Sequence, residues 1–370
     1  MSLRNKIEEY ESFVRRAISQ APQRNHLDIH KDIGKTTVVR PKVALYAAPY
    51  VNWHPYSHQL IQRLITFGFD LATIRNIEDA KNFDLCINVG ENLLNLPGQI
   101  EEIPNAVEIL GLDYFSHIRH NSIRKTVHNF HELLATVDLM SDAKSKKATE
   151  SIIADQLFGL PLHVLDVGMG YDTQYFDTDI FPIHDRETVI DIGAADGDSL
   201  AKFCQVKPKF ERYVAFEPDP ISFKALQSRI ANGSFAGSVT AECKILSNEE
   251  KELRYHATGH GNSRIDNNGT EVIQSTTLDE YCKYFNPTLI KMDTEGSEYE
   301  IILGAEKTIW RCKPKLAISV YHHVEDLFRI PKFIKSIRSD YRFYLRCHTW
   351  ATMNSSWPGS FFCETVLYAV

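Results

Sequence analysis

The stretch TVIDIGAADGDSLAKF, residues 188–203, indicates the fold. An apolar run of strand length, Thr188–Ile192, leads into a turn that contains Gly193 and Gly197, and a helical pattern follows. The two glycines let the turn approach a ligand closely, and the first N–H groups of the helix remain free to bind it. We expect Asp191, near the strand end, to accept a hydrogen bond from that ligand. Strand, glycine turn and helix in this order are typical of a doubly wound, Rossmann-like α/β domain.

A second strand end carries another acidic residue. The apolar run Tyr213–Phe216 is followed by Glu217, which at this place can accept hydrogen bonds from both hydroxyls of a ribose. Asp219 and Pro220 predict the start of the next helix, over Ile221–Ile230, because Asp favours the N-cap and Pro the first helical position. The pattern therefore predicts a bound adenosine.

The composition of the glycine turn distinguishes between two adenosine cofactors. A nicotinamide dinucleotide favours the pattern G-x-G-x-x-G, whereas this turn has the pattern D-x-G-x-x-x-G. The turn also contains Asp196 and Asp198 where a diphosphate would lie. Their charges repel that anion but suit a sulfonium and an ammonium group, so we expect S-adenosyl-L-methionine.

The strand predicted over Thr288–Asp293 leads to the expected site of chemistry. Ligands of open α/β sheets bind beyond the carboxyl ends of the strands, so Asp293, Glu295 and Glu298 should lie at the same rim as the glycine turn. Such carboxylates can accept a proton, surround a sulfonium or hold a divalent cation. For Glu298, a solvated position at the start of the following helix is the simpler interpretation.

His322 follows the next predicted strand, Lys315–Tyr321, and is our first candidate for the general base that activates a hydroxyl. Asp293 and then His348 are the next candidates. Two alternatives stay open: His322 could cap the helix that follows, or Asp293, Glu295 and His322 could together bind Mg²⁺. We expect the route without a metal ion.

The first third of the chain predicts a separate, smaller α/β domain. Strands are predicted over Lys42–Ala48, Phe69–Ile74 and Asp84–Val89, with a helix over Ser57–Phe67. No glycine turn follows the first strand, so we expect no nucleotide there. The predicted division is an N-terminal α/β domain with a helical extension, residues 1–135, and a cofactor-binding domain, residues 136–370.

Composition excludes several classes of protein. The net charge of −7 and the lack of a Lys/Arg run argue against nucleic acid as a partner. Seven widely spaced cysteines without a C-x-x-C pair indicate neither a disulfide framework nor a zinc site. No apolar run reaches the length of a membrane span or a signal peptide, so we expect a cytoplasmic protein without membrane association. The sequence does not indicate an oligomeric state.

From about residue 139 to residue 370, the chain resembles the FkbM-type methyltransferase family. The K-x-D-x-E-G-x-E block at Lys291–Glu298 is the most specific part of the resemblance. Asn248 departs from the family pattern, which often has an acidic residue there. The other matching elements are Asp142 with Ser145-Lys146, Gln174-Tyr175-Phe176, Asp191–Gly197, Glu217-Pro218, Thr277-Leu278-Asp279, Gly304-Ala305, Tyr321-His322-His323 and Glu364–Tyr368.

This resemblance implies a seven-stranded class I methyltransferase sheet and transfer of a methyl group to a hydroxyl, often on a sugar or a polyketide-like metabolite. It adds Ala194, Ala195, Pro218, Ser247 and Tyr175 to the expected cofactor site. Aromatic residues that could line an acceptor pocket, although aromatics are more often core, are Tyr175, Phe176, Trp350, Trp357 and Phe361.

The sequence therefore predicts an S-adenosylmethionine-dependent O-methyltransferase acting on a small molecule, with His322, Asp293 and Glu295 as catalytic residues. The alternatives are an NAD or nucleotide-sugar oxidoreductase and a non-catalytic cofactor-binding scaffold. The missing G-x-G-x-x-G pattern argues against the first. The intact Asp191, Gly193 and Glu217 argue against the second.

Overall fold

The computed structural model of the chain describes residues 122–158, 167–259, 263–349 and 363–370, with short stretches before residue 108 (4, 5, 8, 12, 42–46, 70–74, 79, 82, 85–88 and 106–107). The chain divides into two compact units. The first comprises Met1–Leu134, Lys147–Tyr171 and Cys347–Cys363, and the second Ala135–Lys146, Asp172–Arg346 and Glu364–Val370. Both units contain several segments, so the single boundary after residue 135 stays a prediction.

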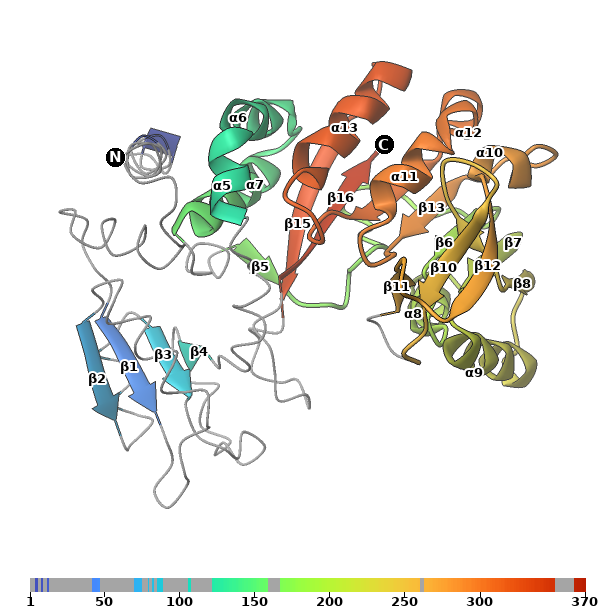
Figure 1. Cartoon of the computed structure of the whole chain (residues 1–370), viewed down its shortest axis with the longest axis horizontal. Coiled ribbons are helices and arrows are strands. Elements are labelled where there is room, and N and C mark those ends of the chain that lie inside the picture. The colour runs from blue at the N-terminus through green and yellow to red at the C-terminus, as the bar shows by residue number, and fades with distance from the viewer. Residues whose placement is uncertain are drawn as a thin grey trace. The chain divides into compact units, whose positions relative to one another are not determined.

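The first unit contains a four-stranded parallel sheet in the order β2-β1-β3-β4 (Figure 1). The strands are β1 (Lys42–Tyr46), β2 (Asp70–Ile74), β3 (Leu85–Asn88) and β4 (Ala106–Val107). The first three lie where strands were predicted. The predicted helix over Ser57–Phe67 lies outside the described residues.

Three helices follow in the chain: α5 (Ser122–His128), α6 (Phe130–Leu139) and α7 (Ala143–Phe158). None of the helices in the described part of the chain combines the length and the apolar character needed to cross a bilayer.

The larger sheet has the strand order β5-β15-β16-β14-β13-β6-β7-β8. Its parallel part consists of β6 (Thr188–Ile192), β7 (Arg212–Phe216), β8 (Ser238–Glu242), β13 (Leu289–Met292) and β14 (Lys315–Ser319). The strand β16 (Cys363–Ala369) pairs antiparallel with β14, and β15 (Phe343–Thr349) follows it in the sheet. The α/β class is confirmed. The sheet has one strand more than the seven predicted, because β5 (Gly168–Met169) pairs with β15.

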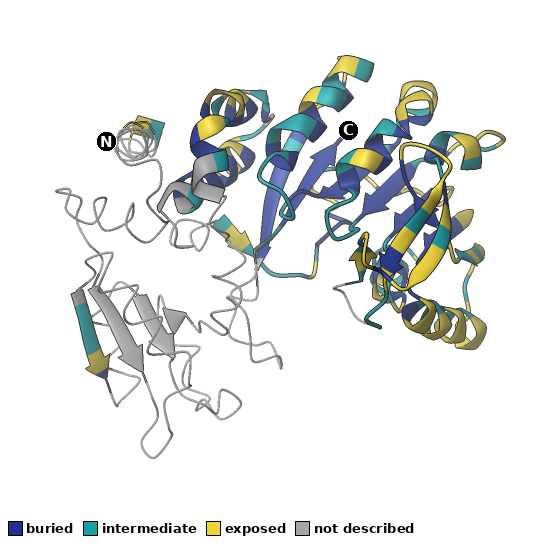
Figure 2. Ribbon diagram, in the orientation of Figure 1, coloured by how far each residue is buried: buried dark blue, intermediate teal, exposed yellow. Residues whose placement is uncertain are grey.

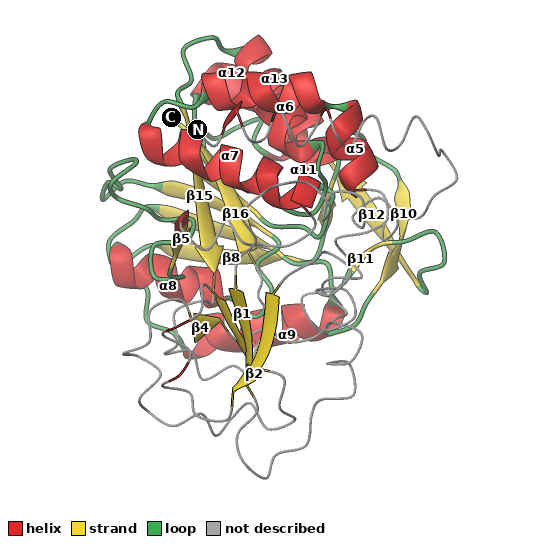
Figure 3. Cartoon of the chain, turned by 90° about the vertical axis from the view of Figure 1, so that its left-hand side faces the viewer, coloured by secondary structure: helices red, strands yellow, loops and turns green. Residues whose placement is uncertain are grey.

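The order of the parallel strands reverses between β6 and β13. Successive crossovers through α8 (Asp198–Val206) and α9 (Pro220–Asn232) run from β6 towards β8. Those through α11 (Glu298–Leu303), α12 (Glu306–Cys312) and α13 (Asp326–Ile337) run the other way. Right-handed crossovers then place the two groups of helices on opposite faces of the sheet, as Figures 1 and 3 show. The reversal is a switch point at which α/β sheets bind ligands.

The centre of this sheet is the core of the second unit (Figure 2). Every residue of β6 and β13 is buried. On one face, the ring of Phe203 lies 5.2 to 5.6 Å, between centroids, from the rings of Phe176, Phe210 and Tyr213. A rigid apolar centre therefore supports the strand ends that carry the polar residues.

A second, smaller sheet follows β8 in the chain, in the order β11-β10-β12-β9. Its strands are β9 (Ile245–Leu246), β10 (Glu252–His256), β11 (Arg264–Ile265) and β12 (Glu271–Thr276), and the short helix α10 (Leu278–Tyr281) comes next. No part of the sequence analysis predicted this sheet. It contributes apolar side chains to the pocket described below.

Candidate functional site

The glycine turn after β6 adopts the left-handed backbone conformation that its sequence predicts, with φ of 75° at Gly193 and 89° at Gly197. A Cβ on Gly193 would lie 1.8 Å from the carbonyl oxygen of Asp293, so this glycine is required because the loops after β6 and β13 touch. A Cβ on Gly197 would lie 2.9 Å from side-chain atoms of Leu226 and Arg229 in α9. Both glycines therefore serve contacts within the protein, not only the approach of a ligand.

A pocket lies at the carboxyl ends of β6, β7 and β13. Five of the ten predicted cofactor residues line it: Gly193, Ala195, Glu217, Pro218 and Asp293. The predicted catalytic residue Glu295 also lines it. Six of its apolar lining residues are Ile192, Phe216, Ile245, Leu246, Ile265 and Ile301. The structure thus brings the glycine turn, both acidic strand ends and an apolar wall together.

The other five predicted cofactor residues lie in the described part of the chain but do not line the pocket: Asp191, Ala194, Gly197, Ser247 and Tyr175. Asp191 is fully buried. Its carboxylate accepts hydrogen bonds from the hydroxyls of Ser199 and Tyr213, and the Nζ atom of Lys291 is 3.0 Å from its Oδ1. Asp191 therefore lies behind the described pocket with protein groups around its carboxylate, and a hydrogen bond from it to a ligand stays a prediction.

Two more of these residues support the loops around the pocket. The N–H of Ala194 donates to the carbonyl oxygen of Phe216, at 3.0 Å, which ties the glycine turn to the end of β7. Ser247 is buried. A Cβ on Gly304 would lie only 2.1 Å from the carbonyl oxygen of Ser247. Gly304 therefore permits the close approach of the loop after β9.

Glu217 holds the end of β7 to the glycine turn. Its Oε2 accepts a hydrogen bond from the N–H of Ala195 at 2.7 Å, and its Oε1 accepts one from the N–H of Asp219 at 2.8 Å. Burial raises the pKa of Glu217 to about 7, although these two hydrogen bonds favour the charged form. Any further hydrogen-bond donor would therefore stabilise the charged form of Glu217 relative to its protonated form.

Asp293 accepts hydrogen bonds from two tyrosines. The hydroxyl of Tyr175 lies 2.7 Å from its Oδ2, and that of Tyr321 lies 3.2 Å from its Oδ1. Tyr175 itself has a left-handed backbone, and its N–H donates to the hydroxyl of Tyr368. Tyr175 therefore influences the pocket by holding the carboxylate of Asp293 in place.

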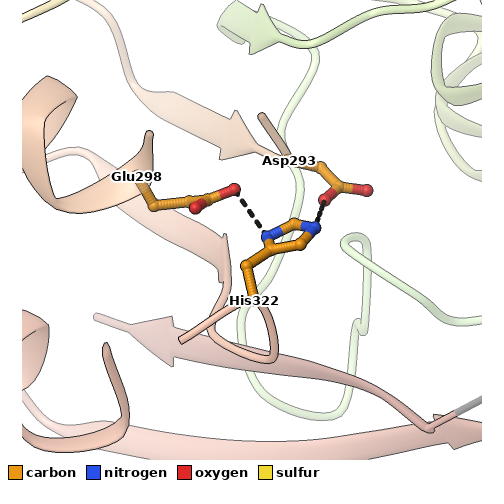
Figure 4. Close-up of side chains that lie close together, drawn as sticks. All are labelled: Asp293, Glu298 and His322. Atoms are coloured by element: carbon orange, nitrogen blue, oxygen red, sulfur yellow. Dashed lines mark ion pairs between the residues drawn. The ribbon is translucent and has the colours of Figure 1, made fainter. Parts of the chain in front are cut away.

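His322 lies among three carboxylates, two of which, those of Asp293 and Glu298, are drawn in Figure 4. Its Nδ1 is 3.0 Å from Glu298 Oε1, and its Nε2 is 3.4 Å from Glu295 Oε2 and 3.8 Å from Asp293 Oδ1. Burial lowers the pKa of His322, but the negative charges of Glu298, Glu295 and Asp293 outweigh burial and raise it well above its ordinary value. His322 does not line the described pocket, whereas Asp293 and Glu295 do.

The sequence did not reveal that Glu298 is buried or that Lys291 holds the loops behind the pocket. Glu298 is fully buried and accepts a hydrogen bond from the N–H of Thr294 at 2.7 Å, so its interpretation as a solvated helix residue is wrong. Lys291 donates to the carbonyl oxygen of Gly193 at 2.6 Å as well as contacting Asp191. A lysine inside the apolar strand Leu289–Met292 was the signal that a buried partner exists.

The remaining candidates lie elsewhere. His348 belongs to the first unit, where it is fully buried and its Nδ1 is 2.9 Å from the carbonyl oxygen of Gly170. Phe176 is buried in the core of the second unit. Trp350, Trp357 and Phe361 lie outside the described residues.

Comparison with known proteins shows what the part of the chain that carries this pocket is similar to. Residues 191–344 match a family model described as the methyltransferase FkbM domain. The 2-O-methyltransferase NoeI of Sinorhizobium fredii is 24% identical over 148 residues, which are 34% of this chain and 60% of that protein. The matched region thus spans less than two thirds of the relative's length.

A solved structure extends the likeness to the whole chain. The crystal structure of methyltransferase FkbM from Methylobacillus flagellatus KT aligns with 100% of this chain and 99% of its own, with a TM-score of 0.64 and 20% sequence identity. At this identity the match shows a common fold. Residues 191–344 are thus similar to the FkbM methyltransferase domain, and the whole chain shares the fold of a methyltransferase of that name.

Proposed function

We propose that the protein transfers a methyl group from S-adenosyl-L-methionine to a hydroxyl of a small molecule such as a sugar. The observation that supports this proposal most strongly is that Glu217, the glycine turn and Asp293 all line the same pocket. Such a pocket at the switch point of an α/β sheet is the expected place for an adenosine cofactor. We also propose that the strands from β15 to β8 form a class I methyltransferase sheet, to which β5 is an addition.

The residues of the pocket fit this cofactor. Each oxygen of Glu217 accepts one backbone N–H, which leaves acceptor capacity on both oxygens for the two ribose hydroxyls. Ile245 and Leu246 offer an apolar surface for the adenine ring. The carboxylates of Asp293 and Glu295 attract the amino and sulfonium groups. In this proposal Asp191, Ala194, Gly197 and Ser247 support the pocket from behind.

The same charges disfavour a nicotinamide dinucleotide. A pyrophosphate at the glycine turn would lie in a pocket that three carboxylates line, and their charges would repel it. These carboxylates belong to Glu217, Asp293 and Glu295, whereas Lys244 supplies a positive charge to the lining. The oxidoreductase alternative is therefore the weaker one. Turnover of any acceptor would exclude a non-catalytic scaffold.

The chain's part in the reaction is to hold the acceptor hydroxyl in line with the methyl carbon and to take its proton. When bound, S-adenosylmethionine supplies an activated methyl group. The acceptor oxygen forms the new C–O bond while the C–S bond breaks and sulfur keeps the electron pair. We assign proton acceptance to Asp293 or Glu295, which line the pocket, and orientation of these carboxylates to His322. This departs from the sequence-based preference for His322 as the base.

The name of NoeI supports transfer to an oxygen, because that relative is described as a 2-O-methyltransferase. We further propose a cytoplasmic enzyme that acts on neither nucleic acid nor membrane. The net charge of −7 supports the absence of a polyanionic acceptor.

The test is transfer of a labelled methyl group from S-adenosylmethionine to a panel of sugars, sugar derivatives and polyketide-like alcohols. We expect an O-methylated product that depends on Asp293, with Asp293→Asn lowering turnover by about 10²- to 10⁴-fold. A product methylated on nitrogen or carbon, or hydride transfer from NADH instead, would contradict the proposal.

A further inference from the structure

Three acidic or imidazole side chains meet at one point beside the pocket. Asp293 follows β13, Glu298 begins α11 and His322 follows β14, so three separate elements place them. Each offers one ligand atom, and these atoms lie within 4.8 Å of one another. Figure 4 shows the imidazole ring between the two carboxylates. Ligand atoms around one metal ion are separated by distances of this order, since each lies about 2.0 to 2.6 Å from the ion.

The cluster also contains buried polar atoms that lack a hydrogen bond. Within the described residues, Nδ1 and Nε2 of His322 and Oε2 of Glu298 are buried and have no hydrogen-bond partner. The side chain of His322 is 10% exposed and that of Glu298 is 0% exposed. The 3.0 Å contact between them brings opposite charges together, but its direction does not make it a hydrogen bond. Buried atoms in this state indicate a missing partner.

The charges of the cluster point to the nature of that partner. Asp293, Glu295 and Glu298 surround one imidazole, so negative charge remains in excess even when the ring is protonated. The nearby lysine, Lys291, contacts Asp191 and the carbonyl oxygen of Gly193. Glu298 is buried, whereas Asp293 and Glu295 are partly exposed, so the excess negative charge faces the pocket and attracts a cation there.

Contrary to the sequence-based expectation of a route without a metal ion, we propose that Asp293, Glu298 and His322 bind a divalent metal ion. One imidazole nitrogen and one oxygen of each carboxylate form a mixed ligand set, which suits a first-row ion such as Mn²⁺, Fe²⁺ or Zn²⁺. With Nδ1 of His322, the nitrogen beside Glu298, bound to the ion, Nε2 can donate its N–H to Glu295. The ion would bind the ring nitrogen of His322 that carries a proton only in the charged form of the imidazole.

The site would be directly useful for methyl transfer, and this part of the inference rests on the function proposed above. Asp293 belongs both to the ligand set and to the pocket wall. An ion held there would lie next to the acceptor hydroxyl and favour its ionisation. The binding of the ion itself does not depend on the cofactor.

Manganese binding to the full chain tests the inference. The protein is stripped with a chelator, dialysed and titrated with Mn²⁺, without cofactor or acceptor, while electron paramagnetic resonance measures free Mn²⁺. We expect one equivalent to bind per chain. His322→Ala and Asp293→Asn should each weaken binding at least about tenfold, the scale for loss of a ligand or its close support. The control His184→Ala, an exposed histidine outside the pocket and the cluster, should bind as the wild type does.

Two results would overturn the inference: a free Mn²⁺ signal unchanged by the wild-type protein, or full affinity in folded His322→Ala. Circular dichroism verifies folding, and Asp293→Asn supplies a variant at a partly exposed side chain if His322→Ala does not fold. Binding of S-adenosylhomocysteine is measured on the same samples. Cofactor binding without Mn²⁺ binding defeats only the metal site, whereas Mn²⁺ binding without cofactor binding defeats only the proposed methyl transfer.

Discussion

Glu217 makes cofactor binding sensitive to pH near neutrality. Burial and, to a lesser extent, the charge of Asp219 raise its pKa, whereas two backbone hydrogen bonds and the charge of Lys291 lower it; the resulting pKa is about 7. The carboxylate form accepts hydrogen bonds from two ribose hydroxyls, whereas protonation removes acceptor capacity. Binding therefore favours the deprotonated form, and the pKa of Glu217 falls in the complex.

We predict that the affinity for S-adenosylhomocysteine is constant above about pH 8 and falls as pH decreases through about 7. A pKa of about 7 makes the affinity at pH 6 about tenfold lower than its plateau. Calorimetry across this range measures the effect. The matched variant Glu217→Gln should bind more weakly and lose the pH dependence. An equally steep fall in Glu217→Gln would assign the titration to another group.

At the scale of residues, the sequence predicted which acids end the strands but not what surrounds them. Glu217 and Asp293 line the pocket as expected. Asp191 looks equivalent in sequence, yet the partners that bury it, Ser199, Tyr213 and Lys291, come from α8, β7 and β13. Contacts of this kind depend on three-dimensional neighbours, which a local pattern does not contain.

At the scale of elements, the glycine turn predicts a sharp effect on stability. Gly193→Ala places a Cβ 1.8 Å from the carbonyl oxygen of Asp293 at a φ of 75°, so two loops must separate. We predict a loss of about 2 to 4 kcal/mol in the free energy of unfolding, from steric strain at a special backbone position. Denaturant unfolding measures it.

Gly170→Ala is the matched control for this prediction. Its Cβ would meet nothing within 4 Å, and its φ lies outside the left-handed region. The free energy of unfolding should change by no more than about 0.5 kcal/mol in this variant. Equal stability of both variants would contradict the contact between the loops after β6 and β13.

Regular elements with a buried face were the most predictable. The apolar run Thr188–Ile192 is β6, and Asp219 caps α9 by accepting hydrogen bonds from the N–H groups of Ile221 and Ser222. The small sheet from β9 to β12 was not predicted, since two of its strands have two residues each and much of it is exposed. Short exposed strands lack the hydrophobic periodicity on which such a prediction depends.

At the scale of the whole molecule, the two units differ in how they resemble known proteins. The second unit contains the matched family domain and all residues of the pocket. For the first unit, likeness of fold to the M. flagellatus structure is the main support, because that alignment covers the whole chain. The sequence predicted three of its strands.

Calorimetric titration of the full chain with S-adenosylhomocysteine, and separately with NADH, tests the central claim most directly. We predict one equivalent of S-adenosylhomocysteine per chain with no heat from NADH. In Glu217→Ala the affinity should fall about ten- to hundredfold, the scale for loss of charge-assisted hydrogen bonds. Binding of NADH in place of S-adenosylhomocysteine, or an affinity that Glu217→Ala leaves unchanged, would contradict the assignment of this pocket to the methyl donor.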